Sequence, residues 1–130
     1  MESSTAALSL STIGQVAIIV KDLSRATAFY RDTLGIKFLF EVPGLSFFDA
    51  GGVRLMLGKA EKPEFDHPAS ILYYKVTDIA GAHRFLESRG VSVVHEPWLI
   101  APMPDHDLWM SFYRDSEENH FALMSEAPRA

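Results

Sequence analysis

Five histidines are the side chains of this chain best suited to acid–base or metal chemistry: His67, His83, His95, His106 and His120. His106 stands between Asp105 and Asp107, and a neighbouring carboxylate can fix an imidazole tautomer or join it in holding a metal. The alternative interpretation is the start of a strand with solvated charges. His67 lies in a polar stretch with prolines and His83 lies within a helical pattern, so we expect both on the surface. The chain has no cysteine, which excludes disulfides, thiol nucleophiles and zinc–thiolate sites.

Other signatures of catalysis are missing from the sequence. No combination of Ser, His and Asp is recognisable as a triad for covalent catalysis. The Gly51-Gly52 pair predicts a turn and lacks the spacing of a phosphate-binding loop. Arg54, which follows closely, is either an exposed strand residue or, if it faces a pocket, a counter-ion for an acidic ligand.

Composition and charge narrow the class of protein. The net charge is −5 and the basic residues are scattered, which argues against a nucleic-acid partner. With 130 residues, 48% of them hydrophobic, the chain can bury a core as one domain. The first twelve residues lack the features of a signal peptide, and no apolar run approaches the ~18 residues of a membrane span. We therefore expect a soluble cytoplasmic protein that binds neither nucleic acid nor membranes.

A strand followed by a capped helix is predicted near the start of the chain. Residues 13–20 are apolar nearly throughout, which is typical of a buried strand. Asp22 or Ser24 can cap the helix that follows, and Gly35 ends it. The apolar positions of this helix form one stripe that faces a sheet: Leu23, Ala26, Phe29, Tyr30 and Leu34.

The same order is written a second time after a polar connector at residues 58–69. The second unit begins at Val76, and its Asp78 matches Asp22 at an offset of 78 minus 22, or 56. One residue then drops out before Gly90. The same offset aligns three further pairs: Leu23 with Ile79, Ala26 with Ala82, and Phe29 with Phe85. We interpret this repeat as a duplicated half-domain.

Three short strands are expected after each helix, at residues 36–41, 45–50, 53–57, 91–95, 108–113 and 120–124. Residues 96–105 are proline-rich and predict a loop. The result is an α+β chain in which strand-helix-strand-strand-strand is written twice. The expected boundaries are a flexible leader at 1–12, module one at 13–58, a linker at 59–69, module two at 70–125 and a tail at 126–130.

Two segments resemble the vicinal oxygen chelate superfamily, which includes glyoxalase I, bleomycin-resistance proteins and extradiol dioxygenases. They are VKDLSRATAFYRDTLG in the first half and RDSEENHFALM at the end of the second. The resemblance implies two tandem βαβββ modules, whose cupped mixed sheets carry helices on the outer face and a pocket on the other. It also implies a homodimer, with sites that draw on both chains. Function needs a separate argument, because this fold hosts unrelated chemistries.

The resemblance also marks four positions at which members of the superfamily hold a metal ion. Gln15 stands at the first and Ile71 at its counterpart in the second half. Ala122 stands at the carboxylate position of the last strand, and Leu55 or Met56 stands at the matching one in the first half. Hard divalent cations need carboxylate oxygens and imidazole nitrogens, and only Gln15 offers even a neutral donor. We therefore expect no metal and no other cofactor.

Strand alternation places further side chains beside these positions. If Ala122 faces the pocket, His120 does as well, and Tyr73 and Lys75 follow the same rule on their own strand. Trp109 points to the opposite face from its neighbours Leu108 and Met110, so either Trp109 or that pair lines the pocket. No catalytic residue is assigned. The candidate ligand-binding residues are Gln15, Arg54, Ile71, Tyr73, Lys75, His106, Trp109, His120 and Ala122.

Three functions compete. The leading hypothesis is a small-molecule binder of the bleomycin-resistance kind, whose apolar and aromatic walls hold a ligand without metal. The second is a glyoxalase-type lyase, isomerase or dioxygenase, with a relocated metal site at His106, His120 and Gln15 or with His120 as a metal-free general base. The third is a degenerate domain kept for dimerisation or sensing. Bound metal would favour the second, metal-free ligand binding the first, and neither the third.

Overall fold

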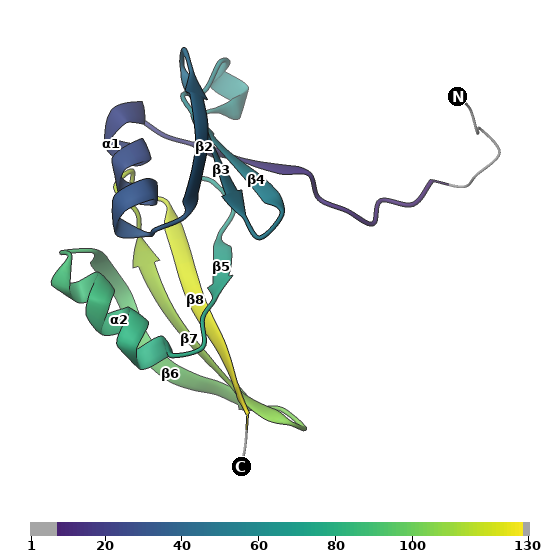
Figure 1. Cartoon of the computed structure of the whole chain (residues 1–130), viewed down its shortest axis with the longest axis vertical. Coiled ribbons are helices and arrows are strands. Elements are labelled where there is room, and N and C mark those ends of the chain that lie inside the picture. Colours follow the sequence, from purple (N-terminus) through teal and green to yellow (C-terminus); the bar gives the residue numbers. More distant parts are fainter. Residues whose placement is uncertain (1–7, 129–130) are drawn as a thin grey trace.

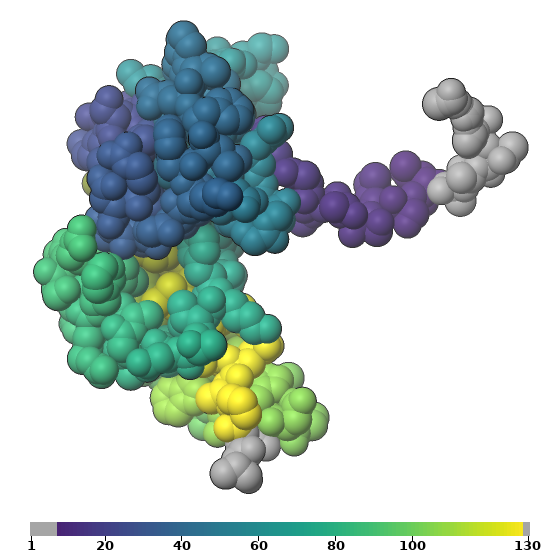
Figure 2. Space-filling view, viewed as in Figure 1, coloured from purple at the N-terminus to yellow at the C-terminus, as the bar shows by residue number. Residues whose placement is uncertain are grey.

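The computed structural model describes residues 8–128, and within them the chain forms two four-stranded mixed sheets. Figure 2 shows the two modules as lobes stacked along the long axis of the molecule. In Figure 1 both helices lie on the same side of the molecule, and the described segment that precedes Gly14 extends away from the body on the other. The α+β fold of tandem βαβββ modules is confirmed. The first seven residues of the expected leader lie outside the described residues.

Module one pairs its first strand with its last. Its elements are β1 (Gln15–Ile19), α1 (Leu23–Ala28), a π-helical turn η1 (Phe29–Thr33), β2 (Lys37–Val42), β3 (Leu45–Ala50) and β4 (Val53–Gly58). The strand order is β1-β4-β3-β2, with β1 and β4 parallel and the other neighbours antiparallel. Because β1 and β4 pair directly, residues 39 positions apart in the sequence become neighbours on one face.

The first helix begins where the sequence predicts and ends differently. The carboxylate of Asp22 accepts a hydrogen bond from the Arg25 backbone N–H at 3.0 Å and caps α1. The Leu34 N–H then donates to the Phe29 carbonyl at 2.9 Å, an i to i+5 bond that makes the last turn π-helical. Gly35 follows at φ +69°, the left-handed conformation that glycine tolerates best. The predicted continuous α-helix is therefore a short one with a wider final turn.

Module two repeats the topology with longer strands. After a connector that contains the 3₁₀ turn η2 (Pro63–Phe65), it comprises β5 (Leu72–Lys75), α2 (Ile79–Ser88), β6 (Ser92–Pro102), β7 (His106–Arg114) and β8 (His120–Pro128). The strand order is β5-β8-β7-β6, again with the first and last strands of the module, β5 and β8, parallel and the other neighbours antiparallel. Asp78 caps α2 by accepting from the Gly81 N–H at 3.0 Å, as Asp22 does for α1. None of the helices among the described residues is long and apolar enough to cross a membrane.

The prediction of a loop at residues 96–105 is wrong. Most of that segment belongs to β6, which pairs with β7 through three irregularities in register. Pro97 lies within one of these irregularities, and both Pro97 and Pro102 belong to a strand at the sheet edge, where a missing N–H costs little. Strand β8 also continues to Pro128, so residues 126–128 belong to the strand although a tail was expected there.

The helices cover one face of each sheet, which we call the outer face. Under α1 the core is built from alternate strand residues and two helix residues: Ile18, Val20, Phe48, Leu55, Leu57, Ala26 and Tyr30. Under α2 it contains Ile79, Leu86, Val91, Tyr113, Phe121 and Leu123. Phe29 and Leu34 pack against both clusters, so the two cores meet at the end of the first helix. The opposite face of each sheet, the inner face, carries the intervening residues.

The turn between β7 and β8 joins the second module to the first. The carboxylate of Glu117 accepts from the backbone N–H groups of Lys21 and Asp22 at 2.8 Å each, and from the Arg25 guanidinium at 2.8 and 3.1 Å. The Asn119 amide donates to the Ile19 carbonyl at 2.9 Å. Burial alone would raise the pKa of Glu117, but these donors hold it at about 2. The turn therefore holds the residues that lead into the first helix of the other module.

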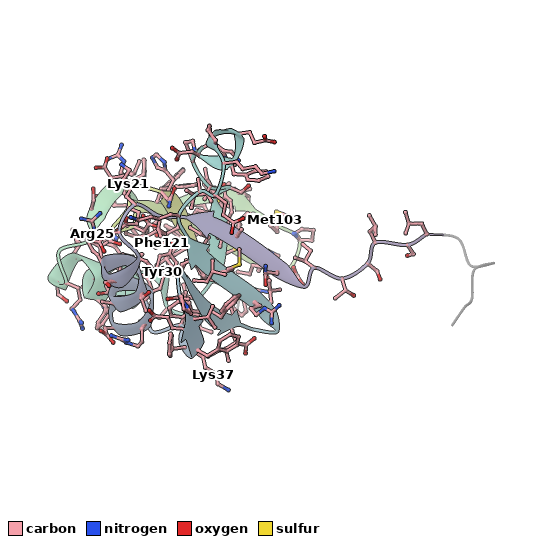
Figure 3. All side chains as sticks on the ribbon, turned by 90° about the horizontal axis from the view of Figure 1, so that it is seen from above. Lys21, Arg25, Tyr30, Lys37, Met103 and Phe121 are labelled. Carbon is pink, nitrogen blue, oxygen red and sulfur yellow. The ribbon has the colours of Figure 1, made fainter. Side chains whose placement is uncertain are left out.

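A buried tyrosine–carboxylate pair lies beneath this turn. The Tyr30 hydroxyl donates to Asp115 at 2.6 Å, and both residues are buried. The other carboxylate oxygen of Asp115 accepts from the N–H groups of Glu117 and Asn119. Burial, reinforced by the Asp115 charge, raises the pKa of Tyr30. Figure 3 places Tyr30 and Phe121 in the middle of the molecule, with Arg25 nearer its edge.

Candidate functional site

Gln15 and Arg54 form a hydrogen-bonded pair on the inner face of module one. They are paired opposite each other in the parallel β1–β4 ladder, and the Arg54 Nε–H donates to Gln15 Oε1 at 2.9 Å. The Gln15 amide nitrogen lies 3.6 Å from the Met56 sulfur. The Arg54 guanidinium also lies 5.4 Å from the ring centroid of Phe47. Arg54 therefore faces the inner side, where the sequence allowed either orientation.

An apolar cavity of about 370 Å³ lies next to this pair. Its floor is the inner face of module one, and the connector with η2 forms one wall. Phe65 at the rim is 47% exposed. Lys59 and Glu61 bring opposite charges to the same wall. The principal lining residues are Ala17, Ile19, Leu45, Met56, Phe65 and His67. Phe65 and His67 could not be placed there from the sequence, because their positions depend on how the connector folds back.

An aromatic row crosses the inner face of module two. Tyr73, Ala122 and Phe112 stand opposite one another on β5, β8 and β7. The rings of Tyr73 and Phe112 are 5.8 Å apart in an edge-to-face arrangement. Trp98 lies 5.8 Å from Phe112 and 3.8 Å from the His95 ring. The sequence predicted Tyr73 and Ala122 here, but missed Phe112, Trp98 and His95 as their neighbours.

Trp109 does not line this face. It packs against the core cluster under α2, on the same side as Tyr113 and Phe121. Its neighbour Met110 takes the inner side with Phe112 by strand alternation. The orientation that the sequence left open is therefore the outer one, with Met110 on the inner side in place of Trp109. The phase was ambiguous because Trp109 has an apolar residue on either side, so both faces of β7 look buried in the sequence.

A chain of charged groups occupies the far end of the same inner face. Lys75 Nζ lies 2.7 Å from Glu126 Oε1, and the other Glu126 oxygen lies 3.8 Å from His106 Nε2. His106 Nδ1 lies 2.7 Å from Asp105. The hydrogen bond from Lys75 lowers the pKa of Glu126, and the one from His106 lowers that of Asp105. Glu126 was missed, although the alternation that assigned Ala122 reaches it once β8 is extended.

His106 and His120 lie too far apart to share a ligand. His120 stands opposite Arg114 on β7, and His106 is eight residues from Arg114 on that strand. At about 3.3 Å per residue the separation is about 26 Å. His120 is exposed at the start of β8, and Ile71, 44% exposed, immediately precedes β5. Within one chain, the relocated site that combines His106, His120 and Gln15 is therefore contradicted.

Of the two histidines expected on the surface, only one is there. His67 is exposed in the connector. The His83 side chain is only 12% exposed, because it points from α2 toward the sheet, where its Nδ1 lies 2.8 Å from the Tyr113 hydroxyl. That hydroxyl donates onward to Ser111 at 2.8 Å. His83 is therefore a structural residue of the outer face.

The superfamily's metal positions do not fit a metal in this chain. Ala122 and Ile71 have no donor atoms, and the fourth position resolves to Met56, because Leu55 is buried on the outer side. The Gln15 oxygen is already bonded to a guanidinium, whose charge repels a cation. Among residues 8–128 no group of three or more His, Cys, Asp or Glu is arranged to hold a metal ion.

The chain builds the same unit twice, a mixed sheet with a helix on one face and an open inner face. This arrangement defines a vicinal oxygen chelate fold. The family model described as Glyoxalase/Bleomycin resistance protein/Dioxygenase superfamily matches residues 12–101, and the chain belongs to that superfamily. No curated protein sequence matches the chain.

Solved structures show the same fold at low identity. A lactoylglutathione lyase from Agrobacterium tumefaciens is 22% identical with a TM-score of 0.70, over 88% of this chain and 93% of that one. TnmS3, an antibiotic-binding protein from Streptomyces sp. CB03234, is 21% identical with a TM-score of 0.73, over 93% and 100%. A superfamily member from Sphaerobacter thermophilus DSM 20745 is 24% identical with a TM-score of 0.73, over 90% and 98%.

Proposed function

We propose that this protein binds an organic small molecule on its inner faces without a divalent metal at the positions that the superfamily resemblance marks. The observation that carries the proposal is the Arg54–Gln15 hydrogen bond, which places a guanidinium at the superfamily's first metal position. A cation there opposes metal binding and offers hydrogen-bond donors to a ligand. TnmS3, with the same fold, is an antibiotic-binding protein.

The surroundings of this pair support ligand binding. The adjacent cavity of about 370 Å³ falls within the range of small-molecule sites, and its floor is mostly apolar. The aromatic row of module two supplies flat surfaces that bind organic rings well. His120, Ile71 and Lys75 remain candidate contacts at the margins of this surface.

We further propose that the protein works as a homodimer in the cytoplasm. Large apolar side chains are exposed on the inner faces, with Phe40 at 45% and Tyr73 at 46%. A second copy would cover them and complete the pocket, since isolated apolar patches of this kind favour association. The cysteine-free composition suits a reducing compartment.

Metal analysis and a ligand screen test this proposal together. Full-length protein, purified without chelators and then exposed to Mn, Zn, Ni and Fe(II), is expected to retain no stoichiometric metal by mass spectrometry. A thermal-shift screen of neutral, cationic and anionic organic compounds is expected to find ligands that raise the melting temperature. Their contacts, mapped by amide chemical shifts, should fall on the inner faces. Stoichiometric metal, or ligands that map only to the outer faces, would overturn the proposal.

A further inference from the structure

The Arg54 guanidinium keeps free donors on the inner face of module one. Its Nε–H is used by Gln15, and among the described residues it contacts only Gln15 and the Phe47 ring. The two terminal amino groups remain, in the fork that binds a carboxylate through two parallel hydrogen bonds. The amide and the ring hold this fork in place, so less side-chain entropy is lost when a ligand binds.

The charges around Arg54 favour a singly charged anion. Asp49 stands opposite Arg54 on β3, but its carboxylate accepts from the Gly52 N–H at 3.0 Å and forms no ion pair with Arg54 among the described residues. In the cavity wall Lys59 and Glu61 offset each other. One guanidinium therefore faces the ligand, and a doubly charged phosphate would lack a second cation.

The apolar cavity begins at the next pair of inner-face residues after Arg54 and Gln15. Ala17 and Met56 form the next row along the β1–β4 ladder and also line the cavity. Two residues along a strand span about 6.6 Å. Phe65 closes the far side from the connector. An acid with a hydrocarbon chain or ring can thus place its carboxylate at Arg54 and its apolar part in the cavity.

We propose that module one binds an apolar monocarboxylate, with its carboxylate on the terminal amino groups of Arg54 and its hydrocarbon part between Ala17, Met56 and Phe65. This inference rests on the proposed function and names its ligand class. Gln15 acts as the positioning residue, since its amide fixes the guanidinium while its nitrogen is held near the Met56 sulfur.

Titration calorimetry with four matched probes tests the ligand class. The probes are 4-phenylbutyrate, 4-phenylbutan-1-ol, 4-phenylbutylamine and 4-phenylbutyl phosphate, each with the full chain. The carboxylate is expected to bind about 10-fold more tightly than the alcohol, and the amine more weakly than both, as charge-assisted hydrogen bonds imply. Equal affinities for acid and alcohol, or tightest binding of the phosphate, would overturn the inference.

Variants locate the contact. Arg54→Gln should weaken binding of the acid about 10-fold and leave the alcohol within twofold. Gln15→Glu should do nearly the same while keeping the arginine, because the new carboxylate occupies the fork. Asp49→Asn should strengthen binding of the acid two- to threefold. The matched control is Arg89→Gln, which removes a guanidinium placed 5.3 Å from the Phe85 ring on the outer side.

Failure of this inference is distinguishable from failure of the proposed function. If no monocarboxylate binds but the broader screen finds neutral or cationic ligands on the inner faces, the inference is wrong and metal-free binding stands. If Arg89→Gln weakens the acid as much as Arg54→Gln does, the carboxylate contacts the surface generally and the inference is again wrong. Circular dichroism of each variant confirms that the fold is retained.

Discussion

Module one and module two are built from the same strand-helix unit, yet their inner faces carry different chemistry. Module one presents a guanidinium–amide pair beside an apolar cavity. Module two presents an aromatic row that ends in the charged chain of Lys75, Glu126 and His106. The outer faces, by contrast, repeat one design, a helix capped by Asp over alternate apolar residues. The two modules therefore share the features that fold them and differ in the residues of their inner faces.

The two modules also depend on each other unequally. Module two supplies Asp115, Glu117 and Asn119 to the start of the first helix and to the buried Tyr30. The corresponding turn of module one is the short Gly51-Gly52 link, where Asp49 of the same module bonds to the Gly52 backbone. Module one should therefore lose more stability than module two when the junction is broken.

The largest effect is expected at the buried end of this junction. Asp115→Ala leaves the Tyr30 hydroxyl and two backbone N–H groups without an acceptor, at a cost of about 3 kcal/mol in the free energy of unfolding. Urea unfolding measures the loss, with Glu64→Ala in the exposed connector as the control. A loss below about 1 kcal/mol would show that the junction matters little.

The two tryptophans separate the faces of module two. Trp109→Ala should destabilise the protein by about 2 kcal/mol, because Trp109 packs in the outer core. Trp98→Ala should cost less stability but alter ligand binding, because Trp98 lies in the inner row. Thermal unfolding and ligand titration of both variants check this. The opposite pattern would mean that the faces of β6 and β7 are assigned the wrong way round.

Acid should weaken the junction through Glu117. Its pKa is about 2 in the folded protein, below the ordinary 4.5, so it stabilises the fold fully above pH 4.5 and loses that contribution as the pH falls toward 2. Glu117→Gln is expected to lower stability by about 1 kcal/mol at neutral pH and to flatten this dependence. Urea unfolding between pH 2 and 7 measures both, and an unchanged pH slope would contradict the assignment.

The smallest expected effect concerns a strained residue in the same turn. Glu118 has φ +66°, a left-handed conformation that costs a residue with a side chain about 1 kcal/mol. Glu118→Gly should therefore stabilise the protein by about 0.5–1 kcal/mol, whereas Glu118→Ala, which keeps the Cβ, should not. Thermal unfolding of the pair distinguishes relief of strain from loss of charge.

Local sequence patterns predicted most of the fold. Asp22, Asp78 and the two glycines after the helices marked both units, because caps and helix ends depend on a few adjacent residues. The prediction of a loop at 96–105 was wrong for a local reason too. Prolines in an edge strand with irregular register do not break that strand. The metal positions at Ile71 and Ala122 could be judged from residue types alone.

The site depended on pairing between distant segments. Sequence by itself determined the two modules, their helix caps and the missing metal ligands, all of which follow from local periodicity or residue chemistry. The tertiary structure decided that Arg54 meets Gln15, that Trp109 faces the helix, and that His106 and His120 lie apart. The register of β1 on β4 and of β7 on β8 fixes these relations, and register is set by packing of the whole sheet rather than by any one strand.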